Sequence, residues 1–390
     1  AARQITTARE NVVIGAGAYE SANSSENYAV VIGYNAGNKV DGIDNVHAIG
    51  YKALENLQAA DGNTAVGFKA GIALTTGVRN TFIGHQAGTE EGATALTGED
   101  NICIGYQAGL KMEQSANRNI LIGSNTGDGQ TVADDMVFIG HNVATAVATT
   151  DANGTVAVGS YAASSLTSGG GVFIGFEAGL QNTTAVRNVV IGYEALDRSG
   201  GNNSQDCIAI GHNAMHGDWA GQGLRNIAIG SYALEATINN ANDNTVIGHN
   251  SGGNITSGDE NTFLGGESGD GITTGGNNTM IGYGTDGSAN NADGQIVLGH
   301  NCIGHGDNKF TFGDGSGNDR VHCTYTSGAT FSHVSDERYK KDIKDTIDIG
   351  LDFINDLRTV TFKWKAKSEI DKDLPDYDET ALEPKYDKKM

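Results

Sequence analysis

A step from an aliphatic residue to glycine recurs along most of this chain and limits its fold more than any other feature. Ile, Val or Leu precedes the glycine in seventeen aligned copies, which are 16 to 21 residues apart and most often 17. A fixed period of this length indicates stacked coils, each of which buries its apolar face only against its neighbours. The step glycines are Gly15, Gly33, Gly50, Gly67, Gly84, Gly105, Gly123, Gly140, Gly159, Gly175, Gly192, Gly211, Gly230, Gly248, Gly265, Gly282 and Gly299.

Two other positions of the repeat have a constant character. The third residue after the glycine is small in every copy and Ala in eleven, and the fourth residue before it is Asn in ten copies. We expect the glycine to supply a positive φ or a close backbone approach at a corner. Asn suits the opposite turn, because it tolerates the left-handed region and bonds its own backbone.

The repeat predicts a mostly β fold. The unit is too short for a helix pair and is rich in β-branched residues, so we expect two short strands and two turns in each coil. The chain has 57 glycines and only 2 prolines, which argues against collagen and against disorder. The predicted fold is therefore a repetitive β-roll or β-solenoid rod of about 17 coils of about 17 residues, followed by a small α+β segment.

The residues before each glycine predict the oligomeric state. In "TFIG" (Thr81 to Gly84) the residues one and three before the glycine point to one side and the middle residue points to the other. Both sides are largely apolar in most copies, and a strand buried on both faces of a thin roll needs a partner surface. We expect a homotrimer, with one face inside each roll and the other at the shared axis.

The residue after each step glycine forms a column of rings. Two interpretations of its histidines are open: threefold rings that bind metal on the axis, or a stacking ladder in which His substitutes for Tyr. The histidines occur singly along the rod, which favours the ladder, so neither a metal nor a cofactor is predicted. The column contains Tyr34, Tyr51, Tyr106, Tyr193, Tyr283, Phe68, Phe176 and the candidate metal ligands His85, His141, His212, His249 and His300.

Charge and cysteine usage exclude several classes of partner. The formal net charge is −22, so the chain is expected to repel nucleic acid and anionic lipid. No apolar run reaches the roughly 18 residues of a membrane-spanning helix, so membrane insertion is not expected. Three of the four cysteines (Cys103, Cys207 and Cys302) take repeat positions for small or apolar residues, and we interpret them as free thiols.

The repeat stops after residue 304, which divides the chain into three parts. Residues 1–304 are the predicted repeat shaft, and residues 305–334 are a junction of short strands with glycine turns. In residues 335–390 apolar residues first follow a helical spacing, from Ile343 to Leu357, and then alternate in "TVTFKWK" (Thr359 to Lys365) as in a strand.

Both parts of the sequence resemble known families. The "N-x-x-I-G-x-x-A-G" coils look like the trimeric left-handed β-rolls of phage tail-fibre shafts and of trimeric autotransporter adhesin heads. The run "SDERYKKDI" (Ser335 to Ile343), with "IGLDFINDLRTVTFKWK" after it, resembles the intramolecular chaperone domain of peptidase family S74. That family drives trimerisation of tail fibres and then cuts itself off. It generally continues beyond the "FKWK" strand, so residues 335–390 are expected to hold only the start of the domain.

The S74 resemblance implies a self-cleavage site. Ser335 would be the nucleophile and Lys340 its general base, and the cut would fall between Val334 and Ser335. A second interpretation is that Ser335 is a helix N-cap with acidic residues in the first turn, and the two roles are compatible. Any enzyme activity would be at most a single-turnover serine peptidase with a Ser-Lys dyad.

The resemblances together imply a structural virion protein. We expect a tail fibre for host adsorption, with other tail proteins and a cell-surface glycan or protein as partners. The alternative is the head of a trimeric bacterial surface adhesin. Two loops are candidates for receptor contact, Thr89 to Asp100 and Met215 to Gly223, the second with an exposed Trp219, although each is also interpretable as a plain loose loop.

Overall fold

The computed structural model describes residues 9–333 apart from gaps at 23–26, 59, 130–131, 148–151, 168, 185, 316–318 and 326–331. The chain divides into two units, Ala1–Val334 and Ser335–Met390. Because all of the second unit lies outside the described residues, the helix and strand expected there stay predictions. The division into shaft, junction and chaperone segment also stays a prediction.

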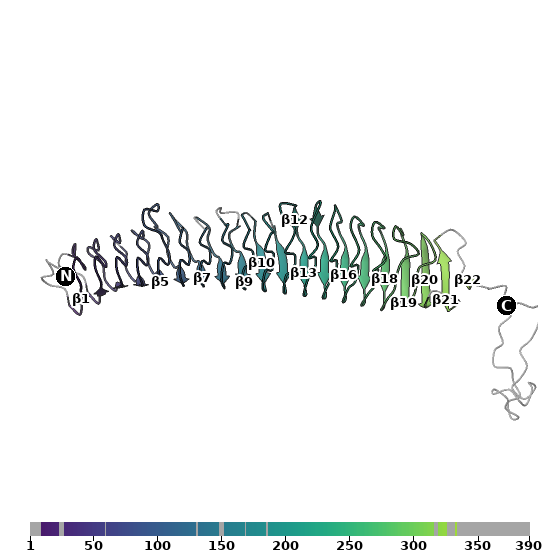
Figure 1. The fold of residues 1–390 in the computed structure, drawn as a ribbon, viewed down its shortest axis with the longest axis horizontal. Helices are drawn as coiled ribbons and strands as arrows, with labels where there is room; N and C mark the ends of the chain where they lie inside the picture. The colour runs from purple at the N-terminus through teal and green to yellow at the C-terminus, as the bar shows by residue number, and fades with distance from the viewer. Residues whose placement is uncertain are drawn as a thin grey trace, which may run out of the picture. The chain divides into compact units, whose positions relative to one another are not determined.

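The first unit is a β-solenoid in which successive coils stack one behind another (Figure 1). One strand from each coil joins a single parallel ladder, and no α-helix occurs in the described part of the chain. The predicted solenoid of about 17 turns is confirmed. The strands are Val12–Ile14 (β1), Val30–Ile32 (β2), His47–Ile49 (β3), Thr64–Val66 (β4), Thr81–Ile83 (β5), Ile102–Ile104 (β6), Ile120–Ile122 (β7), Val137–Ile139 (β8), Val156–Val158 (β9), Gly171–Ile174 (β10), Asn188–Ile191 (β11), Ser204–Gln205 (β12), Ile208–Ile210 (β13), Gly223–Leu224 (β14), Ile227–Ile229 (β15), Thr245–Ile247 (β16), Thr262–Leu264 (β17), Thr279–Ile281 (β18), Ile296–His300 (β19), Lys309–Asp314 (β20), Arg320–Thr324 (β21) and Ser332–His333 (β22).

The ladder continues beyond the last aliphatic-glycine step. Strand β20 pairs in parallel with β19 and places Gly313 opposite Gly299, so it extends the glycine column by one position. The sequence pattern missed this position because Phe312 precedes the glycine and the spacing falls to 14 residues. Strands β21 and β22 then add in antiparallel orientation, which ends the parallel stack.

The step glycines allow neighbouring coils to approach more closely than any side chain permits. At Gly105 φ is +141°, and a Cβ placed there would lie 2.3 Å from the carbonyl oxygen of Gly123 in the next coil. Both reasons given for glycine are therefore confirmed at this position: a backbone conformation that L residues rarely adopt, and a close approach.

The core is formed by the middle residue of each strand and by the small residue after the corner. Phe82, Cys103 and Leu121 are the middle residues of β5, β6 and β7, and all are fully buried. Ala87 and Ala108, three residues after their glycines, are also fully buried. The predicted alternation is confirmed: the middle residue points inward, and the residues on either side of it point outward.

The prediction of two strands in each coil is wrong for most coils. Residues in the left-handed region interrupt the rest of the coil, as at Asp100 (φ 61°), Gln107 (φ 53°) and Gly109 (φ 65°). Such corners prevent an extended run from forming a second strand. Among the described residues a second two-strand ladder forms only between β12 and β14, in coils with wider spacing.

Asn does not play the role that the sequence predicted. The left-handed residue is the one before it, as at Asp100, whereas Asn101 lies outside that region. Its side chain joins coils instead: Asn101 donates its backbone N–H to Asn80 Oδ1 at 3.0 Å, and Asn101 Oδ1 accepts the N–H of Asn119 at 3.0 Å. Each Nδ2 also donates to a backbone carbonyl, for Asn101 that of Ala116 at 2.8 Å. The buried ladders are Asn63, Asn80, Asn101 and Asn119, and later Asn226, Asn244, Asn261 and Asn278.

Replacing a step glycine is expected to destabilise the solenoid strongly. In Gly105→Ala the left-handed backbone alone costs about 1–3 kcal/mol, and the contact with Gly123 adds to that cost. Thermal unfolding monitored by circular dichroism should show a lower midpoint than for Gly201→Ala. Gly201 has open space around it and no positive φ. Equal midpoints for the two variants would contradict the close-approach argument.

Breaking an Asn ladder is also expected to destabilise the stack. In Asn261→Ala the buried N–H of Asn278 and the carbonyl of Gly275 lose their partners, at about 1–3 kcal/mol for each group. The exposed Asn290→Ala is the matched control. Chemical denaturation should give a free energy of unfolding clearly lower for the first variant, and a difference near zero would show that the ladder is dispensable.

Candidate functional site

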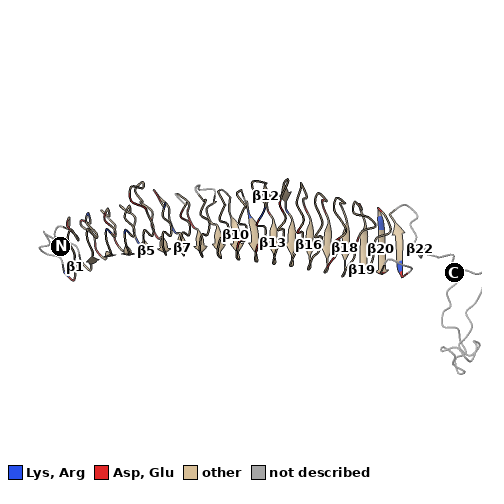
Figure 2. Cartoon of the chain, viewed as in Figure 1, with Lys and Arg blue, Asp and Glu red and all other residues tan. Residues whose placement is uncertain are grey.

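The outward face of the strand ladder is a long uncharged surface. From β1 to β18 no strand contains Lys, Arg, Asp or Glu, and the charged positions fall on the turns instead (Figure 2). Aliphatic side chains on this face are partly exposed, among them Ile83 at 38%, Leu264 at 46% and Ile281 at 40%. Repeated along the whole ladder, they form a long apolar stripe of the kind that marks an interaction surface.

The ring column runs directly beside this stripe. Tyr34, Tyr51, Phe68, His85 and Tyr106 stack continuously, with ring centroids 4.8 to 5.5 Å apart and interplanar angles of 10° to 21°. The predicted stacking ladder is confirmed here. The exposed rings keep one side open: Tyr34 is 52% exposed and Tyr106 50%. The column therefore widens the stripe in the coils that have a ring at this position.

The candidate metal-binding histidines each lie singly in this column. His85 stacks between two rings, His141 meets Tyr161 edge-on, and His300 stacks on Tyr283 with its Nδ1 3.0 Å from Asp314 Oδ1. His212 and His249 contact opposite sides of Tyr232 at near-perpendicular angles. Within the described part of one chain, none of the five belongs to a cluster of three ligand-bearing side chains. Metal binding across chains stays an untested hypothesis.

A column of alternating charge was missed by the sequence analysis. The fifth residue before the step glycine lies in the left-handed region in nearly every coil, and in two runs of four coils Arg and Asp alternate there. Each Arg holds the pKa of the Asp of the next coil below its ordinary value by direct hydrogen bonds. The pairs are Arg79–Asp100, Arg118–Asp135, Arg187–Asp206 and Arg225–Asp243, with Nε–Oδ1 distances of 2.5 to 2.7 Å.

These ion pairs are exposed, so each contributes little to the stability of the fold. The sequence signal was present as Arg or Asp directly before the "N-x-x-I-G" motif. It becomes visible only when the coils are aligned on the glycine, because the spacing varies between coils.

The first candidate receptor loop, Thr89 to Asp100, is held to the coils beside it. Leu96 is fully buried and forms bridges to Leu74 and Gln114. Glu91 pairs with Lys52 at 3.0 Å and with Lys69 at 2.5 Å, which lowers the pKa of Glu91. This loop is therefore a packed insertion rather than a loose one. No finding assigns it a receptor.

The second candidate loop, Met215 to Gly223, corrects one expectation. Trp219 is only 6% exposed, so its interpretation as an exposed side chain is wrong. Its ring lies over Gly223, where an added Cβ would approach within 2.6 Å, beside Ile238 of the next coil. The wider coil provides the room to fold the indole inward. Trp219 is therefore a core residue and not a contact for a receptor.

The cysteines behave as the repeat predicted. Cys103, Cys207 and Cys302 are buried free thiols. Burial raises the pKa of Cys103 and raises that of Cys207 to about 11, so neither is a reactive thiolate at neutral pH. The described part of the chain forms no helix long and apolar enough to span a bilayer.

The comparisons with known proteins address the C-terminal segment, where Ser335 and Lys340 lie outside the described residues. A family model matches one part of the chain. Residues 335–378 match the family described as the chaperone of endosialidase. This match confirms the resemblance of the segment that begins at Ser335. No curated protein matches the chain. A β-solenoid followed by an endosialidase-chaperone segment fits a tail-fibre-like protein.

Proposed function

We propose that this chain is the shaft of a homotrimeric phage tail fibre that serves host adsorption, and that its chaperone segment assembles the trimer. The observation that carries the proposal is the combination of an uncharged stripe along the whole solenoid with the endosialidase-chaperone match. The first favours a partner of equal length, and a chaperone segment is suited to bringing chains together. A virion location, other tail proteins and a host receptor follow from this proposal.

The partner that fits the stripe best is another copy of the same chain. A surface that repeats once per coil is matched in spacing by a surface with the same repeat, so identical chains can align in register over the full ladder. The net charge of −22 opposes side-by-side association of most surfaces. The strands of the stripe carry no charge up to β18, so contact there avoids that repulsion.

Parallel chains also place the chaperone segments together at one end. Three chaperone segments at the C-terminal end would fix both the number of chains and their register before the solenoids associate along their length. This arrangement favours a tail fibre over a bacterial surface adhesin head, because the adhesin alternative gives the segment at residues 335–378 no role.

Self-cleavage is a second, separable part of the proposal. Ser335 Oγ would attack the carbonyl carbon of Val334 while Lys340 takes the hydroxyl proton. The amino group of Ser335 would leave with a proton, and water would hydrolyse the resulting ester. A Lys serves as base only when its pKa is lowered, and burial in an assembled apolar interface has that effect. Cleavage would thus follow correct assembly.

A charge placed on the stripe is expected to disrupt the trimer. In Ile174→Asp each chain would bury a carboxylate in the interface, which costs several kcal/mol when unpaired, whereas Ile174 in the wild type is 37% exposed in one chain. Light scattering after size-exclusion chromatography should give the mass of three chains for the wild type and of fewer for the variant.

The control for that experiment is Gln222→Asp, an exposed position just before β14 and outside the stripe, which should remain trimeric. A monomeric or dimeric wild type would overturn the trimer. Three chains in Ile174→Asp would show that the stripe is not the interface.

Cleavage is tested by intact-mass analysis of the expressed chain. The wild type should give two products, residues 1–334 and 335–390, and Ser335→Ala should give one. Ser332→Ala is the control and should still be cut. Full-length chains in both the wild type and Ser335→Ala would remove the peptidase role and leave the assembly role intact.

A further inference from the structure

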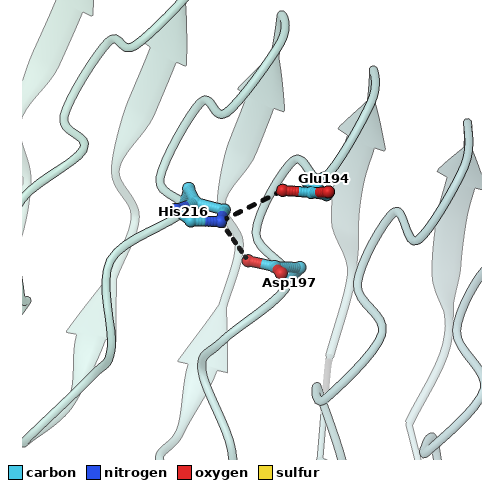
Figure 3. A group of neighbouring side chains, drawn as sticks. All are labelled: Glu194, Asp197 and His216. Atoms are coloured by element: carbon cyan, nitrogen blue, oxygen red, sulfur yellow. Dashed lines mark ion pairs between the residues drawn. The ribbon is translucent and has the colours of Figure 1, made fainter.

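Three side chains able to bind a metal converge between two neighbouring coils, away from the stripe residues discussed above. Asp197 and His216 occupy the same position of adjacent coils, five residues after Gly192 and Gly211, and Glu194 lies in the coil of Asp197. Figure 3 shows the imidazole of His216 directed between the two carboxylates. Among the described residues, these three side chains are the one group of three or more possible metal ligands that lie close together.

The distances leave a gap where an ion would fit. His216 Nε2 lies 3.3 Å from Glu194 Oε2 and 3.6 Å from Asp197 Oδ1, and the three ligand atoms are within 4.8 Å of one another. Asp197 Oδ1 and His216 Nε2 are both buried, and neither forms a hydrogen bond. Buried polar atoms without a hydrogen bond are uncommon, and an ion bound to both atoms would account for them.

Asp197 is the most buried residue of the three, at only 3% exposed, so a negative charge on its carboxylate is costly. Burial raises its pKa to about 6, although His216 and Arg198 act in the opposite direction. Arg198 Nε lies 3.6 Å from the other carboxylate oxygen, Oδ2, and so leaves Oδ1 directed at His216. A buried carboxylate with one oxygen unpaired is costly unless a cation compensates it.

We propose that Glu194, Asp197 and His216 form a binding site for one divalent transition-metal ion, zinc above all. One imidazole nitrogen and two carboxylate oxygens are a zinc ligand set. Tetrahedral bonds of about 2.0–2.2 Å separate ligand atoms by about 3.3–3.6 Å. The two distances from His216 Nε2 match that separation. Water completes the fourth position, since the His216 and Glu194 side chains are 14% and 22% exposed.

A divalent ion explains the site better than an ion pair with protonated His216. A divalent ion binds all three ligand atoms at once, whereas a protonated His216 has a single Nε2 proton to donate toward the two carboxylates. A charged imidazole would also donate a hydrogen bond to one of the carboxylates, and neither bond is made. Asn213, beside Glu194 in register, likewise has a buried Oδ1 without a partner.

The ion would connect two neighbouring coils that are both longer than the common repeat. The coils of Gly192 and Gly211 are followed by spacings of 19 residues instead of the common 17, and they contain β12 and β14. Since Asp197 and His216 belong to different coils, one ion bound to both stabilises their stacking. Its binding adds to the stability of the folded chain alone.

The test uses the full-length chain loaded with ZnCl2 and then dialysed into metal-free buffer, with bound zinc measured by elemental mass spectrometry. We expect one zinc per chain in the wild type and in His212→Gln, a ring-column histidine of the same coil. His216→Gln and Asp197→Asn should lose zinc. Loss of a group that only supports a metal ligand lowers metal affinity by about 10–100-fold, and loss of a ligand itself should lower the zinc affinity by more. Co²⁺ in place of zinc should give the intense visible absorption of a tetrahedral site in the wild type.

Misfolding is separated from ligand loss by the metal-free proteins. Asp197→Asn removes a buried charge, so its metal-free unfolding midpoint should equal or exceed that of the wild type. Zinc should raise the midpoint of the wild type but not that of Asp197→Asn. A wild type that retains no zinc after dialysis, or an equal zinc content in the wild type, His216→Gln and Asp197→Asn, would overturn the site.

Discussion

Direct contact between the backbones of successive coils at the glycine column determines the register of the whole solenoid. At Gly105 no side chain fits between one coil and the next, and the positive φ is one that residues other than glycine rarely adopt. With the corner fixed, the three strand residues before it, the small residue after it and the Asn before it repeat at constant places. The inner residues then fill the core, and the Asn ladders satisfy buried backbone groups that a thin coil cannot satisfy alone.

The sequence predicted the parts of the fold that this contact dictates. The glycine column, the inward middle residue and the stacked rings follow from local chemistry that any copy of the repeat displays. The predictions failed where geometry between coils decides. Asn101 bonds the next coil rather than its own turn, and Trp219 turns inward because its coil is wide. The sequence predicted a short strand at β20 but missed that it continues the parallel ladder, because Phe replaces the aliphatic residue.

The candidate sites also differ in whether they repeat from coil to coil or depend on the geometry between particular coils. The stripe and the ring column are periodic, so aligned copies reveal them. The cluster of Asp197 and His216 arises once, from two residues 19 positions apart that only the register of irregular coils brings together. Alignment on the glycine places both residues five positions after it, but nothing in the pattern distinguishes them from the other residues at that position. Ser335 and Lys340 were identified by family resemblance alone, and their roles still depend on it.

The central claim is that the outward face of the ladder is covered by other copies of the chain. Thiol labelling of Leu264→Cys tests it most directly, because Leu264 is 46% exposed in one chain. The account predicts slow reaction of this thiol with a maleimide in the native assembly and fast reaction after unfolding, whereas Gln222→Cys reacts fast in both. Equal native rates for Leu264→Cys and Gln222→Cys would contradict the account.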